Sequence, residues 1–264
     1  MNKIKKLSIF ILSLSLLSNF VFAEGFVREN NFMNKTGTEK RDELKRWQAQ
    51  MNLPVTGNLN DKTKKALYTE NYEAYDMVVN PPTKGKWIVI NKSRRTLTMY
   101  KGENSIGKYP VTLGTSETPT PSAKGKIQNK RKNPAWGGMN GKYTPIAADD
   151  PNNPLGERWM GLSIIGSNGY GIHGNIKPHQ IGGYYSNGCI RMFNYDIENH
   201  VFPNIPVGAP VWLGTDAELE SWGVYQYSRE KKVDKKEQIQ NQKPVEKSPN
   251  EIIENTPSED LLEF

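Results

Sequence analysis

The chain has 264 residues, of which 36% are hydrophobic and 24% are charged, and its formal net charge is +7 at pH 7. This length allows one sizeable domain and a smaller one. The basic excess is small and scattered, without a stripe of basic residues among aromatic ones, so it argues against a nucleic-acid-binding protein and fits an anionic cell envelope as neighbour.

Residues 1–23 have the pattern of a secretory signal peptide. A basic start with three lysines precedes an apolar run, and the small residues Val21 and Ala23 stand where a signal peptidase needs them. We therefore predict cleavage before Glu24 and an exported, extracytoplasmic protein whose formal charge falls to +4 with the loss of those lysines. An uncleaved membrane anchor is the alternative, although the run is short for a span of about 20 apolar residues.

Residues 40–70 are predicted to form a small helical module. Leu44 and Trp47 recur at helical spacing, and a Pro-Val-Thr-Gly turn follows, in which Gly57 suits a positive φ. Asn60 is placed to cap a second helix. The two helices have too little apolar surface to be stable alone.

The string LKRWQAQMNLPVTGNLNDKTKKAL resembles the second half of the small peptidoglycan-binding module found in many cell-wall hydrolases. The residues that match are Trp47, Gln48, Leu53, Gly57, Thr63, Ala66 and Leu67. The resemblance implies binding to the cell wall, and the alternative is a packing appendage without a ligand. A linker with Pro and Gly is expected over residues 69–85, with a domain boundary near residue 84.

The region 84–214 is predicted to be a mainly β domain, a β-sandwich or barrel-like fold. Alternating patterns and turn residues indicate strands at 86–91, 95–100, 106–113, 125–128, 161–165, 169–173, 189–192 and 209–213. Strands and helices do not alternate, which makes a parallel nucleotide-binding sheet a poor interpretation.

Residues 228–264 differ in kind from the rest of the chain. They are rich in Lys, Glu, Gln, Asn and Pro and nearly free of aromatic residues. Such a segment cannot bury enough apolar surface to offset its ordering entropy, so we predict a disordered tail.

The stretch GIHGNIKPHQIGGYYSNGCIRM, residues 171–192, contains the only cysteine, Cys189, and two of the three histidines. A single thiol in an exported protein cannot form an internal disulfide and indicates an intermolecular bridge or a reactive group. His173 is expected at the end of one strand and Cys189 at the start of another, so the two can meet. The imidazole would then take the proton of a thiol whose reference pKa is about 8.5.

The residues around this pair provide the other parts of a nucleophilic site. Backbone N–H groups of Asn187, Gly188 and Cys189 could point at one oxyanion. A backbone carbonyl near Gly174 could orient the imidazole of His173.

Two other interpretations of the cysteine remain open at this point. It could be an inert buried residue beside a core histidine, or it could belong to a metal site. A metal site needs three or four ligands at metal spacing, whereas this chain has one Cys and three His, so we expect no metal. A papain-type peptidase has the reverse order, with Cys well before His.

Residues 86–213 resemble the catalytic domain of bacterial L,D-transpeptidases, the YkuD-type domain. The resemblance is carried by TPTPSAKGKI, NPLGERWMGL, IHG, IGGYYSNGCIRM and NYDIENHVFPNIPVGAPVWL. Two positions depart from the family pattern. Asn187 stands where His is frequent, which excludes a basic side chain there, and Asn175 stands where Thr or Ser is frequent.

The resemblance implies an enzyme that crosslinks peptidoglycan stem peptides. Cys189 would attack the donor tetrapeptide, form a thioester and release the terminal D-Ala, with His173 as general base and then acid. The carbonyl of Gly174 would orient His173. No metal or organic cofactor is expected, because nucleophile, base and oxyanion donors all come from the chain.

Arg191, Ser186 and Tyr185 are the expected substrate contacts. Arg191 could pair with a substrate carboxylate or form a structural ion pair, Tyr185 could line the donor groove, and Ser186 could also shape the turn. Two alternative functions stay open. One is an L,D-carboxypeptidase that uses water as acceptor, and the other is a non-catalytic wall-binding protein in which the cysteine is incidental.

Overall fold

The computed structural model describes residues 27–164 and 169–231. The predicted signal peptide over residues 1–23, and the predicted tail from residue 232 onward, lie outside the described residues. Within the described part of the chain, every helix is too short or too polar to cross a bilayer.

Eight strands of the described residues form the main sheet. In spatial order they are β10 (Ile190–Arg191), β8 (Gly171–His173), β7 (Arg158–Ser163), β6 (Ala123–Lys132), β11 (Pro210–Gly214), β2 (Lys86–Asn91), β3 (Thr96–Lys101) and β4 (Asn104–Pro110). β10 runs parallel to β8 and β11 runs parallel to β2, whereas the other neighbours are antiparallel. The predicted mainly β fold is therefore confirmed.

Strand β2 is buried on both of its faces, which explains its continuous apolar run. Ile88 and Ile90 point into the main core, while Trp87 and Val89 belong to a second cluster on the opposite face. All four side chains are 0% exposed. A strand covered on both faces reads as an unbroken apolar run rather than an alternating one.

One helical run packs against the main core and follows directly from β10. It comprises α4 (Asn194–Asp196), the π-helical turn η2 (Ile197–Val201) and α5 (Phe202–Asn204). Ile197 and Val201 are fully buried in the main core.

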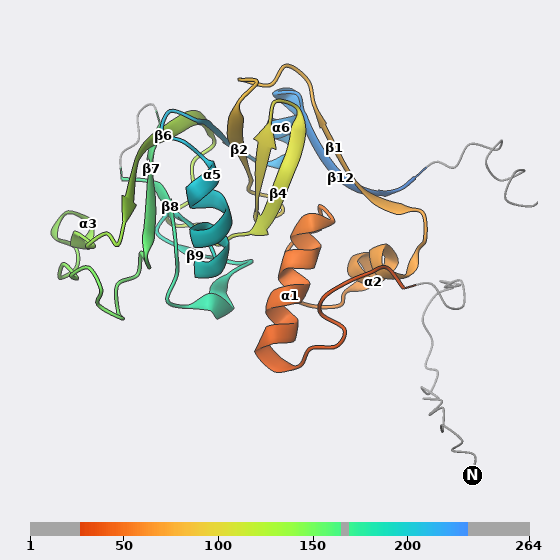
Figure 1. Ribbon diagram of the computed structural model, residues 1–264, viewed down its shortest axis with the longest axis horizontal. Helices are drawn as coiled ribbons and strands as arrows, with labels where there is room; N and C mark the ends of the chain where they lie inside the picture. Colours follow the sequence, from red (N-terminus) through yellow and green to blue (C-terminus); the bar gives the residue numbers. More distant parts are fainter. Residues whose placement is uncertain (1–26, 165–168, 232–264) are drawn as a thin grey trace, which may run out of the picture. The chain divides into compact units, whose positions relative to one another are not determined.

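A separate two-stranded ribbon lies outside the main sheet (Figure 1). It pairs β1 (Tyr72–Val78) with β12 (Val224–Glu230), and α6 (Asp216–Ser221) precedes β12. Val78 and Val224 cover Trp87 in the second cluster. The ribbon corrects two expectations, because the expected linker over residues 69–85 contains β1, and the first three residues of the expected tail complete β12.

The helical module consists of α1 (Gly37–Gln50) and α2 (Asp61–Tyr68). Asn60 caps α2, with its side chain accepting from the backbone N–H of Thr63 at 3.0 Å. Gly57 has a φ of +70°, as the turn requires. The buried Gln48 amide oxygen accepts from the N–H groups of Thr56 and Gly57 at 2.8 and 2.9 Å, so it holds this turn in place.

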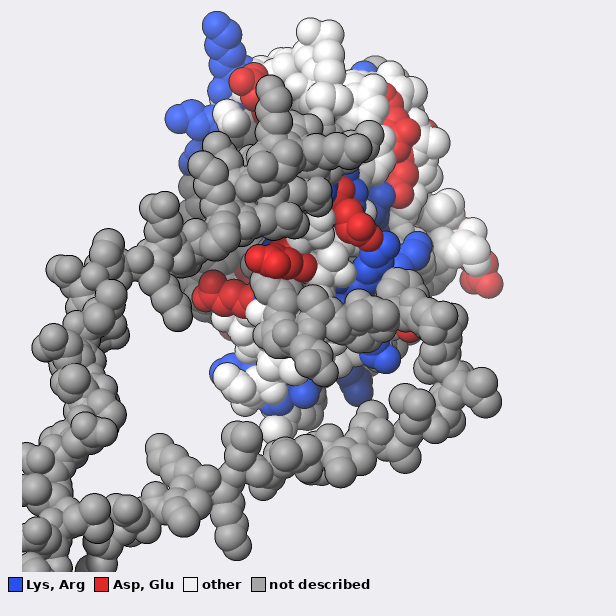
Figure 2. Space-filling model, turned by 90° about the vertical axis from the view of Figure 1, so that its right-hand side faces the viewer, with Lys and Arg blue, Asp and Glu red and all other residues white. Residues whose placement is uncertain are grey.

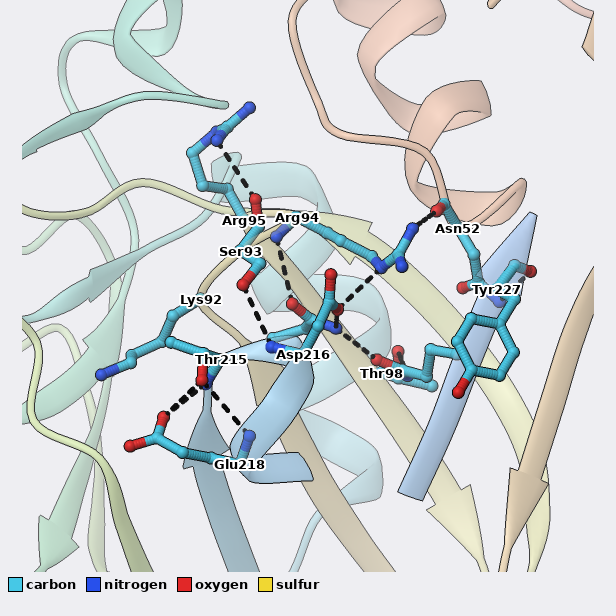
Figure 3. Close-up of polar contacts among 12 residues, drawn as sticks. Asn52, Lys92, Ser93, Arg94, Arg95, Thr98, Thr215, Asp216, Glu218 and Tyr227 are labelled. Carbon is cyan, nitrogen blue, oxygen red and sulfur yellow. Dashed lines mark hydrogen bonds and ion pairs between the residues drawn. The ribbon is translucent and has the colours of Figure 1, made fainter. Parts of the chain in front are cut away.

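The module is joined to the main sheet through the segment that links its two helices. The N–H of Val55 donates to the carbonyl of Arg94 at 3.1 Å. Arg94 in turn donates to the carbonyl of Asn52 and, through Nε, to Asp216 at 2.9 Å (Figure 3). The described residues up to Glu230 belong to one compact unit.

Most predicted strands lie within a few residues of observed ones. The predicted strand 106–113 divides into β4 and β5 (Leu113–Gly114). The sequence did not indicate β9 (Tyr184–Ser186), which pairs parallel with β5.

Acidic and basic side chains lie next to one another on the face shown in Figure 2.

Candidate active site

The structure brings Cys189 and His173 to one cavity of about 590 Å³, called here the catalytic cavity. Strands β8 and β10 are parallel neighbours, with Ile172 opposite Ile190 and His173 opposite Arg191. Cys189 directly precedes β10, and residues two apart on a strand share a face. Cys189, Arg191 and His173 therefore present their side chains to the same side of the sheet.

His173 is 3% exposed and held by a backbone carbonyl. Its Nδ1 lies 2.8 Å from the carbonyl oxygen of Gly174, which was the orienting group predicted from the sequence. Because a carbonyl only accepts, Nδ1 carries the ring proton and Nε2 is left as the acceptor. The pKa of His173 is lowered to about 3, mainly by burial and also by the charge of Arg191, while the carbonyls of Gly174 and Leu155 act in the opposite direction.

Cys189 is partly exposed, and its Sγ lies 3.7 Å from the carbonyl oxygen of Gly169. Removal of water from around the sulfur raises the pKa of the thiol, while the backbone of Gly171 and the charge of Arg191 oppose the rise. A raised thiol pKa and a lowered imidazole pKa leave both groups neutral at pH 7. A nucleophilic attack by this thiol would therefore require a proton transfer to accompany it.

The turn before Cys189 is shaped by Ser186. Its hydroxyl donates to the carbonyl of Cys189 at 2.6 Å and accepts from the N–H of Gly188 at 3.1 Å. Gly188 has a φ of +103°, and a Cβ there would lie 2.5 Å from the ring of Tyr170. Of the three predicted oxyanion donors, the N–H of Gly188 is therefore already engaged by Ser186, and those of Asn187 and Cys189 stay candidates.

The three predicted substrate contacts have different positions. Arg191 lines the catalytic cavity and donates to Gln180 Oε1 at 3.2 Å, and its Nε is buried without a partner among the described residues. Ser186 is 1% exposed and turned into the protein. Tyr185 is 58% exposed, but the cavity lining does not include it.

Asn175, which departs from the family pattern after the His-Gly pair, organises the backbone next to His173. Its N–H donates to Asn194 Oδ1 at 2.7 Å, and its side chain exchanges hydrogen bonds with Lys177. It is 5% exposed. An amide therefore serves a local structural purpose at this position.

The loop between His173 and Cys189 is tied to the helical module through Arg95. The Nε of Arg95 donates to the carbonyl of Gly182 at 2.6 Å, and its Nη2 donates to that of Val55 at 2.9 Å. A Cβ on Gly182 would lie 2.7 Å from Val55 Cγ1, so the loop approaches the module as closely as a glycine permits. One arginine thus joins the main sheet, the module and the loop that precedes Cys189.

Sequence reasoning missed several cavity residues, among them Asn129, Arg131, Trp136, Met139 and Trp159. Some of them come from a flap around α3 (Gly138–Gly141), where Met139 and Asn140 have left-handed φ values of 55° and 57°. The Nδ2 of Asn187 reaches Met139 Sδ at 3.6 Å. The string WGGMNGKY carries Gly-Gly and Asn-Gly turn signals, but these do not indicate which site a flap covers.

No group of three or more His, Cys, Asp and Glu side chains within the described ranges could hold a metal ion. Other lining residues of the cavity include two arginines, Arg131 and Arg191, and no carboxylate belongs to its described lining. The site therefore combines a neutral thiol, a neutral imidazole and two cations.

Comparison with known proteins gives a consistent result. Residues 85–213 match the family model for the L,D-transpeptidase catalytic domain, YkuD. The chain is 34% identical over 139 residues to the Bacillus subtilis protein YqjB, which is named as an L,D-transpeptidase, and the match covers 52% of this chain and 76% of YqjB.

More distant similarities extend to other bacteria. YbiS of Escherichia coli, named as a probable L,D-transpeptidase, is 31% identical over 146 residues, which cover 51% of this chain but only 46% of YbiS. A crystal structure of an L,D-transpeptidase from Xylanimonas cellulosilytica has 16% sequence identity and a TM-score of 0.46, and the similarity covers 67% of this chain and 81% of that one.

Proposed function

The chain belongs to the L,D-transpeptidase family, and from this premise we propose that it is an exported cysteine L,D-transpeptidase that crosslinks peptidoglycan stem peptides. The observation that carries the proposal is the convergence of Cys189 and a carbonyl-oriented His173 in one cavity. Its extracytoplasmic location follows from the predicted signal peptide and from the substrate.

In the first half-reaction, Cys189 Sγ attacks the carbonyl of the third stem residue, a diamino acid. Nε2 of His173 takes the thiol proton as the C–S bond forms and then gives it to the departing amine of D-Ala. The C–N bond breaks, and a thioester remains on Cys189. N–H groups of Asn187 and Cys189 stabilise the tetrahedral oxyanion.

In the second half-reaction, the side-chain amine of another stem attacks the thioester. His173 removes a proton from the attacking nitrogen, an amide bond forms and the C–S bond breaks. The sulfur recovers a proton, so thiol and imidazole return to the neutral resting pair. No redox step or external cofactor enters this sequence.

The charge of the catalytic cavity supports a peptide with free carboxylates as donor. Arg131 and Arg191 line it, and a guanidinium binds a carboxylate in a bidentate manner. Arg191 carries the buried Nε without a partner, which a substrate carboxylate would satisfy. We assign Arg191 as the carboxylate contact nearest to the nucleophile.

Wall binding by the helical module remains a separate proposal. Of the residues that carry its resemblance, Trp47, Gln48, Leu53, Thr63, Ala66 and Leu67 are at most 6% exposed, so they build the module's own core. Any glycan contact must therefore come from other side chains. A pull-down with purified walls, comparing the mature chain with Cys189→Ala and with a chain that lacks residues 40–68, tests this proposal.

The first experiment uses the chain from Glu24 onward, mixed with a disaccharide-tetrapeptide and followed by mass spectrometry, with Cys189→Ala in parallel. Loss of D-Ala together with a dimer joined between two diamino acids is the expected result. Loss of D-Ala without a dimer identifies a carboxypeptidase. An unchanged substrate, with wall binding intact, overturns the enzymatic proposal in favour of a wall-binding protein.

A further inference from the structure

A row of four side chains crosses the sheet beside the nucleophile. Arg131 of β6 is the register partner of Trp159 of β7, Trp159 is the partner of His173 of β8, and His173 is the partner of Arg191 of β10. All four line the catalytic cavity. Because register partners present their side chains on the same face, the base has an indole on one side and a guanidinium on the other.

The indole of Trp159 lies flat against the base and is anchored at its polar end. The rings of Trp159 and His173 stack with centroids 5.8 Å apart and planes 26° apart. The indole Nε1 donates to Asn129 Oδ1 at 3.1 Å. The ring is partly exposed, so one face touches the imidazole and the remainder borders the cavity.

Two glycines make room for this arrangement. Gly161 of β7 and Gly171 of β8 are register partners in the next row of the sheet. A Cβ on Gly171 would lie 2.3 Å from the six-membered ring of Trp159, and one on Gly161 would lie 3.0 Å from its Nε1. Any larger residue at Gly171 would push the indole off the base.

The stack supplies what the hydrogen bond to Gly174 lacks. That bond fixes Nδ1 but leaves the imidazole plane free to tilt about it, and a tilt would move Nε2 relative to Cys189. The indole also removes water from one face of the ring, and water near the base is a competing acceptor for a thioester. A general base acts efficiently only when its proton acceptor is held in line with the nucleophile.

We propose that Trp159, anchored by Asn129, is the positioning residue that fixes the imidazole plane of His173 and shields the base and the thioester from water. The part of this inference that concerns the thioester rests on the proposed transpeptidase function. The part that concerns the imidazole does not, and it can be tested without any substrate.

The substrate-free test is an NMR titration of ¹³C-labelled histidines in the full chain. The chain contains three histidines, so His179 and His200 serve as internal controls. The charged and titratable groups that face His173 are Arg191 on its own side of the sheet, Cys189 beside it and Arg131 at the end of the row. These remain in place in each variant described below.

In the wild-type chain His173 is expected to stay neutral down to about pH 3, because its burial lowers the pKa. In Trp159→Leu we expect its midpoint to rise by at least one pH unit towards the reference value of about 6.5. Trp159→Phe retains a stacking ring and should stay near wild type. An unchanged His173 midpoint in a folded Trp159→Leu chain overturns the proposal.

Trp136→Leu is the matched control for loss of an indole from the same cavity. Trp136 packs against Tyr143, with ring centroids 5.5 Å apart and planes tilted by 33°, rather than against His173. Its replacement should leave the His173 midpoint in place. A shift as large as that of Trp159→Leu would show that general opening of the cavity, and not the stack, determines the protonation of the base, which would also overturn the proposal.

The second readout is the ratio of hydrolysed to crosslinked product from the tetrapeptide. Trp159→Leu is expected to lower kcat at least tenfold with little change in KM and to raise the hydrolysed fraction several-fold. Asn129→Ala should show the same changes to a smaller degree. If the wild-type chain forms crosslinks and Trp159→Leu gives the same product ratio, the shielding role is contradicted. If the wild-type chain shows no turnover at all, the proposed function is refuted, and the titration alone decides on the positioning of the imidazole.

Discussion

The catalytic cavity and the hollow beneath the helical module use charge in opposite ways. The second hollow, of about 1080 Å³ and called here the module groove, lies between α1, β4 and α4 and has four carboxylates in its lining. Its cations are paired within the protein. Arg46 lies 2.8 Å from Glu43 and 3.1 Å from Asp196, and Lys108 is paired with Asp76.

The two arginines of the catalytic cavity form no ion pair with any described residue, unlike those of the groove. The larger hollow thus has its charges committed to holding the module, whereas the smaller one keeps its cations available. Cavity size alone would have selected the module groove as the candidate site. Unpaired cations beside a cysteine and a histidine favour the smaller cavity.

The largest effect is expected at the base of the catalytic cavity. Replacing His173 by Ala should lower the rate of D-Ala release by about 10²–10⁴-fold, because the neutral thiol then has no proton acceptor. Initial rates measured by mass spectrometry check this, with Arg46→Leu of the module groove expected to keep kcat near wild type. A rate of D-Ala release in His173→Ala within tenfold of wild type would contradict the proposal that the catalytic cavity, and not the module groove, is the active site.

The next effect concerns the stability of the module groove. Arg46→Leu leaves the Asp196 carboxylate, 3% exposed, without its cation, which should lower the free energy of unfolding by about 3 kcal/mol. Urea unfolding followed by circular dichroism measures it. Lys35→Leu, which breaks the solvent-exposed pair with Glu39, is the control and should unfold like wild type. Equal losses in the two variants would contradict a structural role for the groove charges.

The buried histidine of the catalytic cavity should make the free energy of unfolding depend on pH. The folded-state pKa of His173 is lowered to about 3, so its contribution to stability is present above the unfolded value of about 6.5 and is lost as pH falls towards 3. Between pH 7 and pH 4 the wild-type chain should lose on the order of 3 kcal/mol more than His173→Asn does. Unfolding curves at the two pH values measure the difference, and parallel losses would contradict a buried neutral base.

The smallest effect should come from the exposed cation of the catalytic cavity. Arg131→Gln is expected to raise KM several-fold with kcat nearly unchanged, because in the proposed function Arg131 would bind the carboxylates of the donor equally in the ground and transition states. Its neighbour Lys132 points to the other side of β6 and lies outside the cavity, so Lys132→Gln is the matched control. Steady-state kinetics at low and physiological salt measure KM and kcat for both variants. Equal increases of KM in the two would show that Arg131 acts only through the general positive charge of the surface.

The sequence predicted that His173 and Cys189 would meet because the determinants of this meeting are local. His173 and Cys189 lie at strand ends within one short motif, and Gly174, whose carbonyl orients the imidazole, is the next residue after His173. The cap at Asn60 and the positive φ at Gly57 were predictable for the same reason.

Features that depend on distant segments were not predictable in this way. Trp159 acquires its position from the register of β6, β7 and β8, and β1 pairs with a strand about 150 residues further along the chain. The sequence led us to expect a free N–H at Gly188. In the structure this N–H donates to the hydroxyl of Ser186, and the sequence does not specify the turn geometry that brings the two together.

The bridge that Arg95 makes between Val55 and Gly182 has an evolutionary consequence. Parts of a chain that recombine freely between proteins are separated by boundaries that few contacts cross. Here a boundary after α2 would separate the module from the loop that leads to Cys189. A replacement module would need a carbonyl in the position of Val55 to accept from Arg95, and a side chain small enough to pack against Gly182. The module and the catalytic loop are therefore expected to be inherited and to diverge together, as a single unit of selection.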